Sequence, residues 1–163
     1  GPMAEIKDYF KPEFAKGLTQ GANSDKFAID SFTSGAAGKF IALYGLDELI
    51  DSIPDTIKEF QIQNRDSKNV IIHIPESFGR FKNLETILFD NCIESLPESI
   101  CELKKLRFIA VMNNKKMKTL PECTATLPYL TFVNADKSEN FVLPKSLQEK
   151  QPQKMGEGKI KKS

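Results

Sequence analysis

The sequence predicts a repeat protein built from stacked coils, and three observations support that prediction. Pro75, Pro97 and Pro121 each begin a copy of one pattern, and Pro144 begins a further copy that reaches Leu147. Apolar residues recur at fixed distances after each proline. The length differences between copies fall in a single turn. A period of roughly 20 to 50 residues is the signature of stacked repeats, each of which buries its apolar side only against its neighbours.

The apolar ladder is the strictest part of the pattern. The third position after each proline is Phe78, Ile100 or, as the exception, Thr124. The positions six, nine, twelve and fourteen residues after the prolines are Phe81, Leu84, Ile87 and Phe89; Leu103, Leu106, Ile109 and Val111; and Leu127, Leu130, Val133 and Ala135. The seventeenth position holds Cys92, Asn114 or Ser138, and the next proline follows after five, seven or six residues. Insertions are tolerated in turns and not in core layers, so this turn is the variable part of the coil.

The pattern L-x-x-L-x-L-x-x-N/C, followed by L-P-x-x-[I/F]-x-x-L-x-x-L, resembles the leucine-rich repeat family, in particular its intracellular class with proline-bearing repeats of about 23 residues. Residues 106–114 carry the first part of the motif and residues 96–100 the second. The resemblance implies an α/β fold, a short right-handed leucine-rich-repeat solenoid of about three to four repeats over residues 51–147. Its parallel strands would line the concave face, and helical or irregular segments the convex face.

An earlier and less regular copy precedes Pro75. Ile57, Phe60 and Ile62 have the spacing of inward positions in a strand. The run 64–73 is longer than the other turns. This copy is therefore either degenerate or the point where a cap meets the first regular repeat.

Both ends of such a stack need a cover, because each exposed leucine forgoes roughly 1.5 to 3 kcal/mol of burial. Residues 3–50 are expected to form an α-helical N-terminal cap of two or three short helices, because their apolar side chains fall at helical spacings. Residues 148–163 are expected to be a disordered basic tail, since 145–163 hold six lysines and two acids. Residues 1–2, before Met3, are typical of a protease-cleavage remnant of recombinant expression.

Composition narrows the classes of function. The net charge is +1, and the basic tail supplies four positive charges in excess, so the rest of the chain is about three charges negative. That balance argues against a nucleic-acid surface, which needs a basic stripe. No apolar run is long enough to span a bilayer, and no signal peptide is evident, so we expect a cytoplasmic protein without integral membrane contact. Three cysteines in that setting are expected to be free and reduced.

No catalytic, cofactor or metal site is predicted. Residues 33–39 resemble a phosphate-binding loop but lack its first glycine, and Phe40 replaces the hydroxyl residue that would hold magnesium. His73 is the only histidine, and the cysteines form no C-x-x-C pair. The family resemblance explains Cys92 differently: it stands in the slot of Asn114 and Ser138, whose side chains bond backbone groups of the turn.

The candidate functional residues lie between the inward positions of the strands. Because side chains alternate along a strand, these residues face outward on the concave side. An uncertain first row is Glu59, Gln61 and Gln63, and the next row begins at Thr86. The predicted partner-binding residues are Leu88, Asp90, Phe108, Ala110, Met112, Phe132, Asn134 and Asp136. Phe108 and Phe132 should be adjacent, with Leu88 and Met112 close by and the aspartates at one margin, which is the composition of a protein-binding surface.

The sequence therefore favours a non-enzymatic interaction module that binds a protein or peptide partner. One alternative is that the chain itself, or a second copy in a homo-oligomer, covers the apolar patch. Another makes residues 3–50 a small ligand-binding or catalytic unit, with the repeats as a targeting element; it would use carboxylates among Asp8, Glu13, Asp25, Asp30, Asp47 and Glu48. A third is that the chain is a fragment of a larger multidomain protein.

Overall fold

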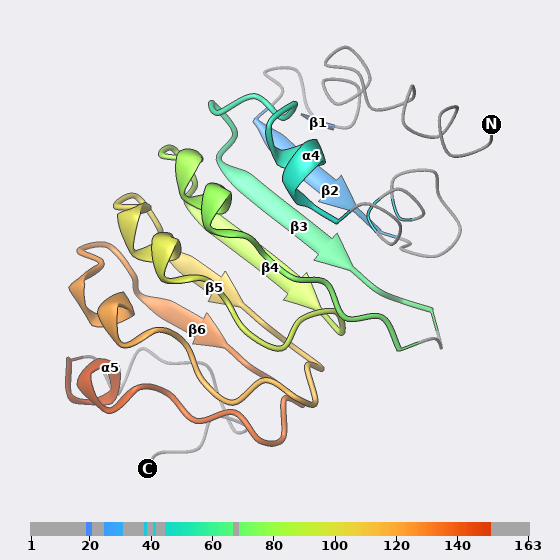
Figure 1. The fold of residues 1–163 in the computed structure, drawn as a ribbon. Helices are drawn as coiled ribbons and strands as arrows, with labels where there is room; N and C mark the ends of the chain where they lie inside the picture. The colour runs from blue at the N-terminus through green and yellow to red at the C-terminus, as the bar shows by residue number, and fades with distance from the viewer. Residues whose placement is uncertain are drawn as a thin grey trace.

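The fold is a six-stranded sheet whose strands follow one another in sequence order (Figure 1). It is known from a computed structural model that describes residues 19–20, 25–30, 38, 41, 45–66 and 69–150. The strands are β1 (Thr19–Gln20), β2 (Lys26–Ile29), β3 (Glu59–Gln63), β4 (Thr86–Asp90), β5 (Phe108–Ala110) and β6 (Phe132–Asn134). Strands β2 to β6 are parallel, whereas β1 pairs antiparallel with β2. Each coil of the repeat thus adds one parallel strand beside the previous one.

Short helical segments connect the strands and stack along one side of the sheet (Figure 1). They are α4 (Asp47–Ile50), the 3₁₀ helices η1 (Glu76–Arg80), η2 (Glu98–Glu102) and η3 (Glu122–Thr126), and α5 (Lys145–Lys150). Each 3₁₀ helix has a repeat proline at its N-cap. A 3₁₀ helix has three residues per turn, so the apolar positions three and six residues after the proline lie on the same, inward side. The repeat spacing itself therefore explains the 3₁₀ geometry.

Thr124, the exception in the apolar ladder, is fully buried. Its Oγ1 donates a hydrogen bond of 2.7 Å to the carbonyl oxygen of Pro121, one helical turn earlier. A buried hydroxyl without a partner would be costly, and this local bond removes the cost. Threonine consequently fills an apolar slot without disturbing the coil.

The core runs without interruption from β2 to α5. Its first half is built on Phe60, whose ring lies 4.8 to 5.8 Å, centroid to centroid, from the rings of Phe27, Phe78, Phe81 and Phe89. At the positions of Phe78, Phe81 and Phe89, the next coil has Ile100, Leu103 and Val111, and the last has Thr124, Leu127 and Ala135. The predicted strand through Phe60 and Ile62 is confirmed, because both are fully buried and the residues between and beside them are half-buried.

The helical interpretation of the N-terminal segment is wrong at residues 19–20 and 26–29, where two strands form instead. Side chains of β2 alternate between half-buried and buried, and Phe27 and Ile29 lie in register with Phe60 and Ile62 of β3. This alternation has a period of two residues, but it covers only the four residues of β2. In the sequence, the helical spacings on either side of so short a run dominate the pattern. Helix α4 does fall inside the expected cap, whereas residues 3–18 lie outside the described part of the chain.

The C-terminal end also begins differently from the expected disordered tail. Leu147 is buried, as the fourth copy predicted, but α5 continues to Lys150 and so includes residues 148–150. Lys150 Nζ donates to the carbonyl oxygen of Ala125 at 2.6 Å, which ties α5 to η3. Basic side chains commonly bond the last carbonyls of a helical segment. Residues 151–163 lie outside the described part of the chain.

The expectation of three reduced thiols is corrected for two of them, because Cys101 and Cys123 form a disulfide between η2 and η3. Their Cα atoms are 5.9 Å apart. The offset of the two cysteines, four and two residues after their prolines, is what brings them together. The equivalent residues one coil earlier are Gly79 and Ser99, and a Cβ on Gly79 would lie only 2.9 Å from the Cβ of Ser99. Cys92 is free and buried, as predicted.

Removing the disulfide with Cys101→Ala and Cys123→Ser should lower the free energy of unfolding by about 3 kcal/mol. The bond closes a loop over a sequence separation of 22 residues, and its loss restores that loop's freedom to the unfolded chain. Urea unfolding of the variant and the oxidised protein, followed by circular dichroism, measures the difference. Equal midpoints would show that the cross-link adds no stability.

Candidate functional site: the outer face of the sheet

The outer face is the side of β2 to β6 whose residues alternate with the buried ladder. In β3 and β4 the outward residues are all half-buried, while their neighbours are buried. In β5 and β6 the first outward residue of each strand is exposed and the second is half-buried. The alternation expected from the sequence is therefore present in all four strands.

Phe108 and Phe132 form an aromatic pair at the start of β5 and β6. They occupy the same level of the sheet, and their ring centroids are 6.3 Å apart in an edge-to-face arrangement. Their exposed fractions are 41% and 39%, whereas the neighbouring Ile109 and Val133 are fully buried. Edge-to-face rings at this distance attract one another, so each phenylalanine helps to hold the other in place. The pair is a preformed apolar projection on a rigid sheet.

Leu88, Ala110 and Asn134 form the next level, in register across three strands. Leu88 is thus diagonal to Phe108, one strand over and two residues along, and all three residues are half-buried. Thr86, which was not among the predicted partner-binding residues, lies directly level with Phe108. Register across strands decides such neighbours, and the repeat pattern shows it only indirectly.

Met112 lies in the turn after β5, four residues beyond Phe108, and its carbonyl oxygen accepts a hydrogen bond from the N–H of Asn91 at 3.0 Å. Asp90 ends β4, and the carbonyl oxygen of Asp136 accepts from the N–H of Asn113. Both aspartates thus lie at the same end of the sheet as Met112. Asp90 Oδ1 accepts a hydrogen bond of 2.9 Å from Asn113 Nδ2, so this carboxylate already has one partner within the chain.

The outer face is polar toward its N-terminal strands. Lys26 and Glu59 approach to 3.9 Å at the level of the aromatic pair. Gln63 accepts a hydrogen bond from Arg65 at 3.1 Å. Because these residues precede β4, the apolar patch is confined to the C-terminal half of the sheet.

A polar hollow of about 680 Å³ lies beyond the C-terminal ends of the strands. Its lining includes Asn64, Arg65, Asp90, Asn113, Lys115 and Lys137. Three acidic and three basic residues line it in all, so it has no strong preference for either charge. Sequence reasoning missed this feature.

One feature of the sequence is related to the hollow. The sixteenth position after each proline, held by Asn91, Asn113 and Lys137, lies in the turns that line it. All three adopt positive φ angles, of 57°, 58° and 60°. Asparagine tolerates this left-handed conformation better than most residues, so its recurrence there indicates a sharp turn. Only the fold shows that the turns surround a hollow.

Cys92, Asn114 and Ser138 share one position in successive coils, and the side chains of Asn114 and Ser138 bond backbone groups of the turns, as predicted. We call this row of hydrogen bonds the turn ladder. Asn114 Oδ1 accepts from the backbone N–H groups of Cys92 and Ile93, at 2.8 and 3.1 Å. Ser138 Oγ accepts from the N–H of Asn114 and donates to a backbone carbonyl oxygen. Burial, with a smaller effect of the Asp90 charge, raises the pKa of the Cys92 thiol to about 12. That thiol is protonated and inert at neutral pH.

In the part of the chain that the structure describes, no three or more His, Cys, Asp or Glu side chains gather in a way that would hold a metal ion. His73 is exposed. The phosphate-loop-like segment 33–39 lies outside the described residues, apart from Gly38. None of the described helices is long and apolar enough to cross a membrane.

The stacked parallel strands, the recurring 3₁₀ helices and the asparagine-type ladder form a fold like that of leucine-rich repeat domains. Comparison with known proteins agrees. The chain is 35% identical over 63 residues to the leucine-rich repeat and calponin homology domain-containing protein 1 of Mus musculus, which is 38% of this chain and 9% of the mouse protein. The chain therefore spans only a small part of that relative. No protein-family model matches the chain.

A solved structure with a similar fold is the leucine-rich repeat domain of the type III effector XopL. The two superpose with a TM-score of 0.55 over 99% of this chain and 57% of the XopL chain. Their sequence identity is 12%, so the likeness concerns the fold alone. The same scaffold presents unrelated surfaces in different proteins, so the fold by itself assigns no function.

Proposed function

We propose that this chain is a non-enzymatic module that binds a protein or peptide through the outer face of its sheet. The observation that carries the proposal is the aromatic pair. Phe108 and Phe132 are held by ring contact on a rigid sheet, and each leaves about two fifths of its surface exposed. Large aromatic side chains at the centre of a surface provide most of the free energy of protein binding.

The surroundings of the pair define the chemistry of the partner. Leu88 and Ala110 extend the apolar contact across two strands, and Asn134 supplies a polar group on the third. The partner would also contact the end of the sheet at which Met112 lies. There Asp90 and Asp136 favour basic groups, although Lys137 follows Asp136 directly and limits that preference. A partner with an apolar anchor and a mixed-charge flank fits this face.

The proposal predicts that Phe108→Glu with Phe132→Glu abolishes partner binding while the fold is retained. Two carboxylates would replace the apolar anchor, and each side chain points away from the core. Affinity capture from a native host lysate with the intact chain and the double variant, at matched circular dichroism, identifies proteins that require this face. The affinity of each should then be measured with purified partner, where a loss of at least tenfold is expected.

Tyr129→Glu is the matched control. Tyr129 is the most exposed large apolar residue in the described part of the chain, at 62%, but it lies in a turn outside the strand rows. The Tyr129→Glu variant should bind the partner with the same affinity as the intact chain. Equal binding by the double variant would exclude the outer face. Loss of a dimer as the only change, seen by mass in solution, would assign the face to self-association.

A further inference from the structure

We propose that the Cys101–Cys123 disulfide is a reversible redox site that opens and closes within the folded chain, and that Glu98 slows its opening. The proposal concerns the convex, helical side of the coil stack and is independent of the proposed partner-binding function. It rests on a repeated contact between coils, on the partial exposure of Cys123 and on the charge beside that residue.

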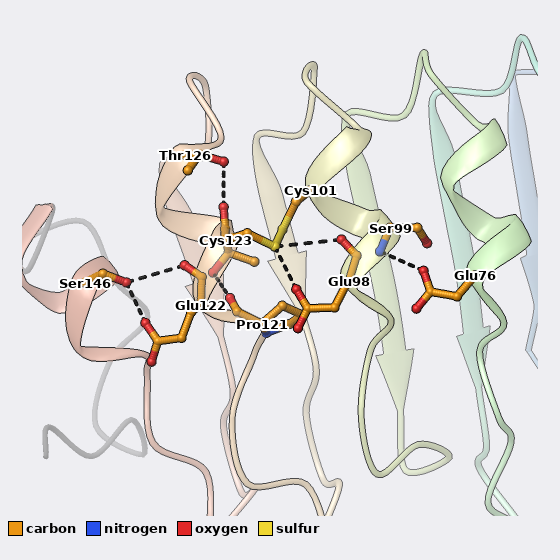
Figure 2. Close-up of a disulfide and its surroundings, with 10 residues drawn as sticks. Glu76, Glu98, Ser99, Cys101, Pro121, Glu122, Cys123, Thr126 and Ser146 are labelled. Atoms are coloured by element: carbon orange, nitrogen blue, oxygen red, sulfur yellow. Dashed lines mark hydrogen bonds between the residues drawn. A yellow bond between two sulfur atoms is a disulfide. The ribbon is translucent and has the colours of Figure 1, made fainter.

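The repeated contact links each coil to the next through the residue one position after the proline (Figure 2). Glu76 Oε2 accepts from the N–H of Ser99 at 3.1 Å. Glu122 Oε2 accepts from Ser146 Oγ at 2.8 Å. Ser99 and Ser146 each lie two positions after the proline of the next coil. The residue two positions after the next proline from Glu98 is Cys123, and the Glu98 carboxylate lies beside it.

Cys123 therefore occupies a serine slot. Its Sγ lies 3.1 Å from Glu98 Oε2 and 3.7 Å from the Glu98 carbonyl oxygen (Figure 2). A disulfide sulfur has no proton, so this approach is a contact while the bond to Cys101 is closed. Once reduced, the Cys123 thiol can donate to Glu98 as Ser146 donates to Glu122. Cys123 thus has a partner in both redox states without any movement of the backbone.

The coils on either side of the disulfide have other connections that remain when it opens. Strands β5 and β6 pair in register, and Asn114 and Ser138 are hydrogen-bonded beneath the turn. Equivalent coils without cysteine, joined at Gly79 and Ser99, pack in the same manner. Reduction is therefore expected to leave the fold intact.

The opening reaction is a thiol–disulfide exchange with a dithiol reductant. A thiolate of the reductant attacks Cys123 Sγ, which is only partly buried; the S–S bond breaks, and Cys101 leaves as a thiolate that takes a proton. The second thiol of the reductant, as its thiolate, attacks the mixed disulfide and releases Cys123, which is protonated in turn. Two electrons pass to the protein disulfide, and the dithiol is oxidised to a cyclic disulfide.

Glu98 acts on the first step because the attacking thiolate and the carboxylate are both negative. At about 4 Å in water, two like charges repel enough to slow an encounter roughly five-fold, and salt screens the effect. The same negative charge disfavours a thiolate at Cys123 in the open state. Glu98 is thus a positioning residue that controls rates in both directions.

The test measures the rate of reduction of the folded protein by dithiothreitol, with Glu98→Gln as the variant. Glutamine keeps the size of the side chain and removes its charge, so reduction should be roughly three- to tenfold faster, by an amount that falls as salt rises. Glu122→Gln, the equivalent change one coil later, should leave the rate unchanged. With an uncharged phosphine as reductant, all three proteins should react alike.

Labelling with maleimide, followed by mass spectrometry, separates opening from unfolding. Two labels are expected, first on the partly exposed Cys123 and more slowly on Cys101, which is 9% exposed, while Cys92 stays unlabelled because it is fully buried. Adding oxidised dithiothreitol should restore the closed form. Three labels appearing together, or failure to close again, would show that the bond opens only in the unfolded chain. Equal rates for Glu98→Gln and the unchanged protein would remove the role of Glu98.

Discussion

Replacing Asn114 by alanine is expected to lower the free energy of unfolding by about 3 to 5 kcal/mol. Its amide satisfies three backbone groups: the N–H of Cys92, the N–H of Ile93 and the carbonyl oxygen of Phe89. Asn114 is only 2% exposed, so water cannot easily take its place. Each buried polar group left without a partner costs about 1 to 3 kcal/mol, and the three losses occur together.

Urea denaturation with linear extrapolation provides the measurement. Asn140→Ala is the matched control, because the Asn140 amide also donates to a backbone carbonyl, that of Lys115, but at an exposed site. Its effect should be within about 0.5 kcal/mol. If both variants were equally mild, the ladder would be a consequence of the coil geometry and not a source of its stability.

Replacing Phe60 by alanine is expected to cost about 3 to 5 kcal/mol, the usual range for removing a buried phenylalanine ring. The Phe60 ring is fully buried and lies within 5.8 Å, centroid to centroid, of four other rings. One of them is Phe27 of β2, stacked at 4.8 Å. The loss should therefore loosen the attachment of β2 to the repeats as well as lower global stability.

Hydrogen exchange of the β2 amides distinguishes the two effects. In Phe60→Ala these amides should exchange much faster than those of β5, which lies two strands away from the substitution. Gln61→Ala, the next residue of β3 on the outer face, should leave both strands unchanged. Uniformly faster exchange in all strands of Phe60→Ala would instead show that β2 and the repeats unfold as one unit.

The repeat core was predictable because its pattern is periodic. Inward positions recur without a slip in Phe81, Leu103 and Leu127, and a residue that must meet its counterpart in the next coil leaves a regular trace in the sequence. The alternation of β4 to β6 followed directly, and with it the adjacency of Phe108 and Phe132. Even the exception, Thr124, was visible as an exception, although its hydrogen bond to Pro121 was not.

The features that the sequence did not reveal depend on contacts between non-equivalent positions. Cys101 and Cys123 stand at different places in their coils, so no count of repeat positions pairs them. Strand β2 is a single short run without a repeat of its own, and only its register with Phe60 and Ile62 makes it part of the sheet.

The sequence alone was enough to predict the apolar ladder of the repeats, the variable turn, the slot shared by Cys92, Asn114 and Ser138, and the residues that face outward. These follow from local spacing, since each coil repeats the same inward positions. The tertiary structure alone decided the disulfide, the β2 strand, the hollow and the neighbours of the aromatic pair. Those features depend on how adjacent coils are offset and on which side chains of neighbouring coils come into contact. The period of a single repeat specifies neither of the two.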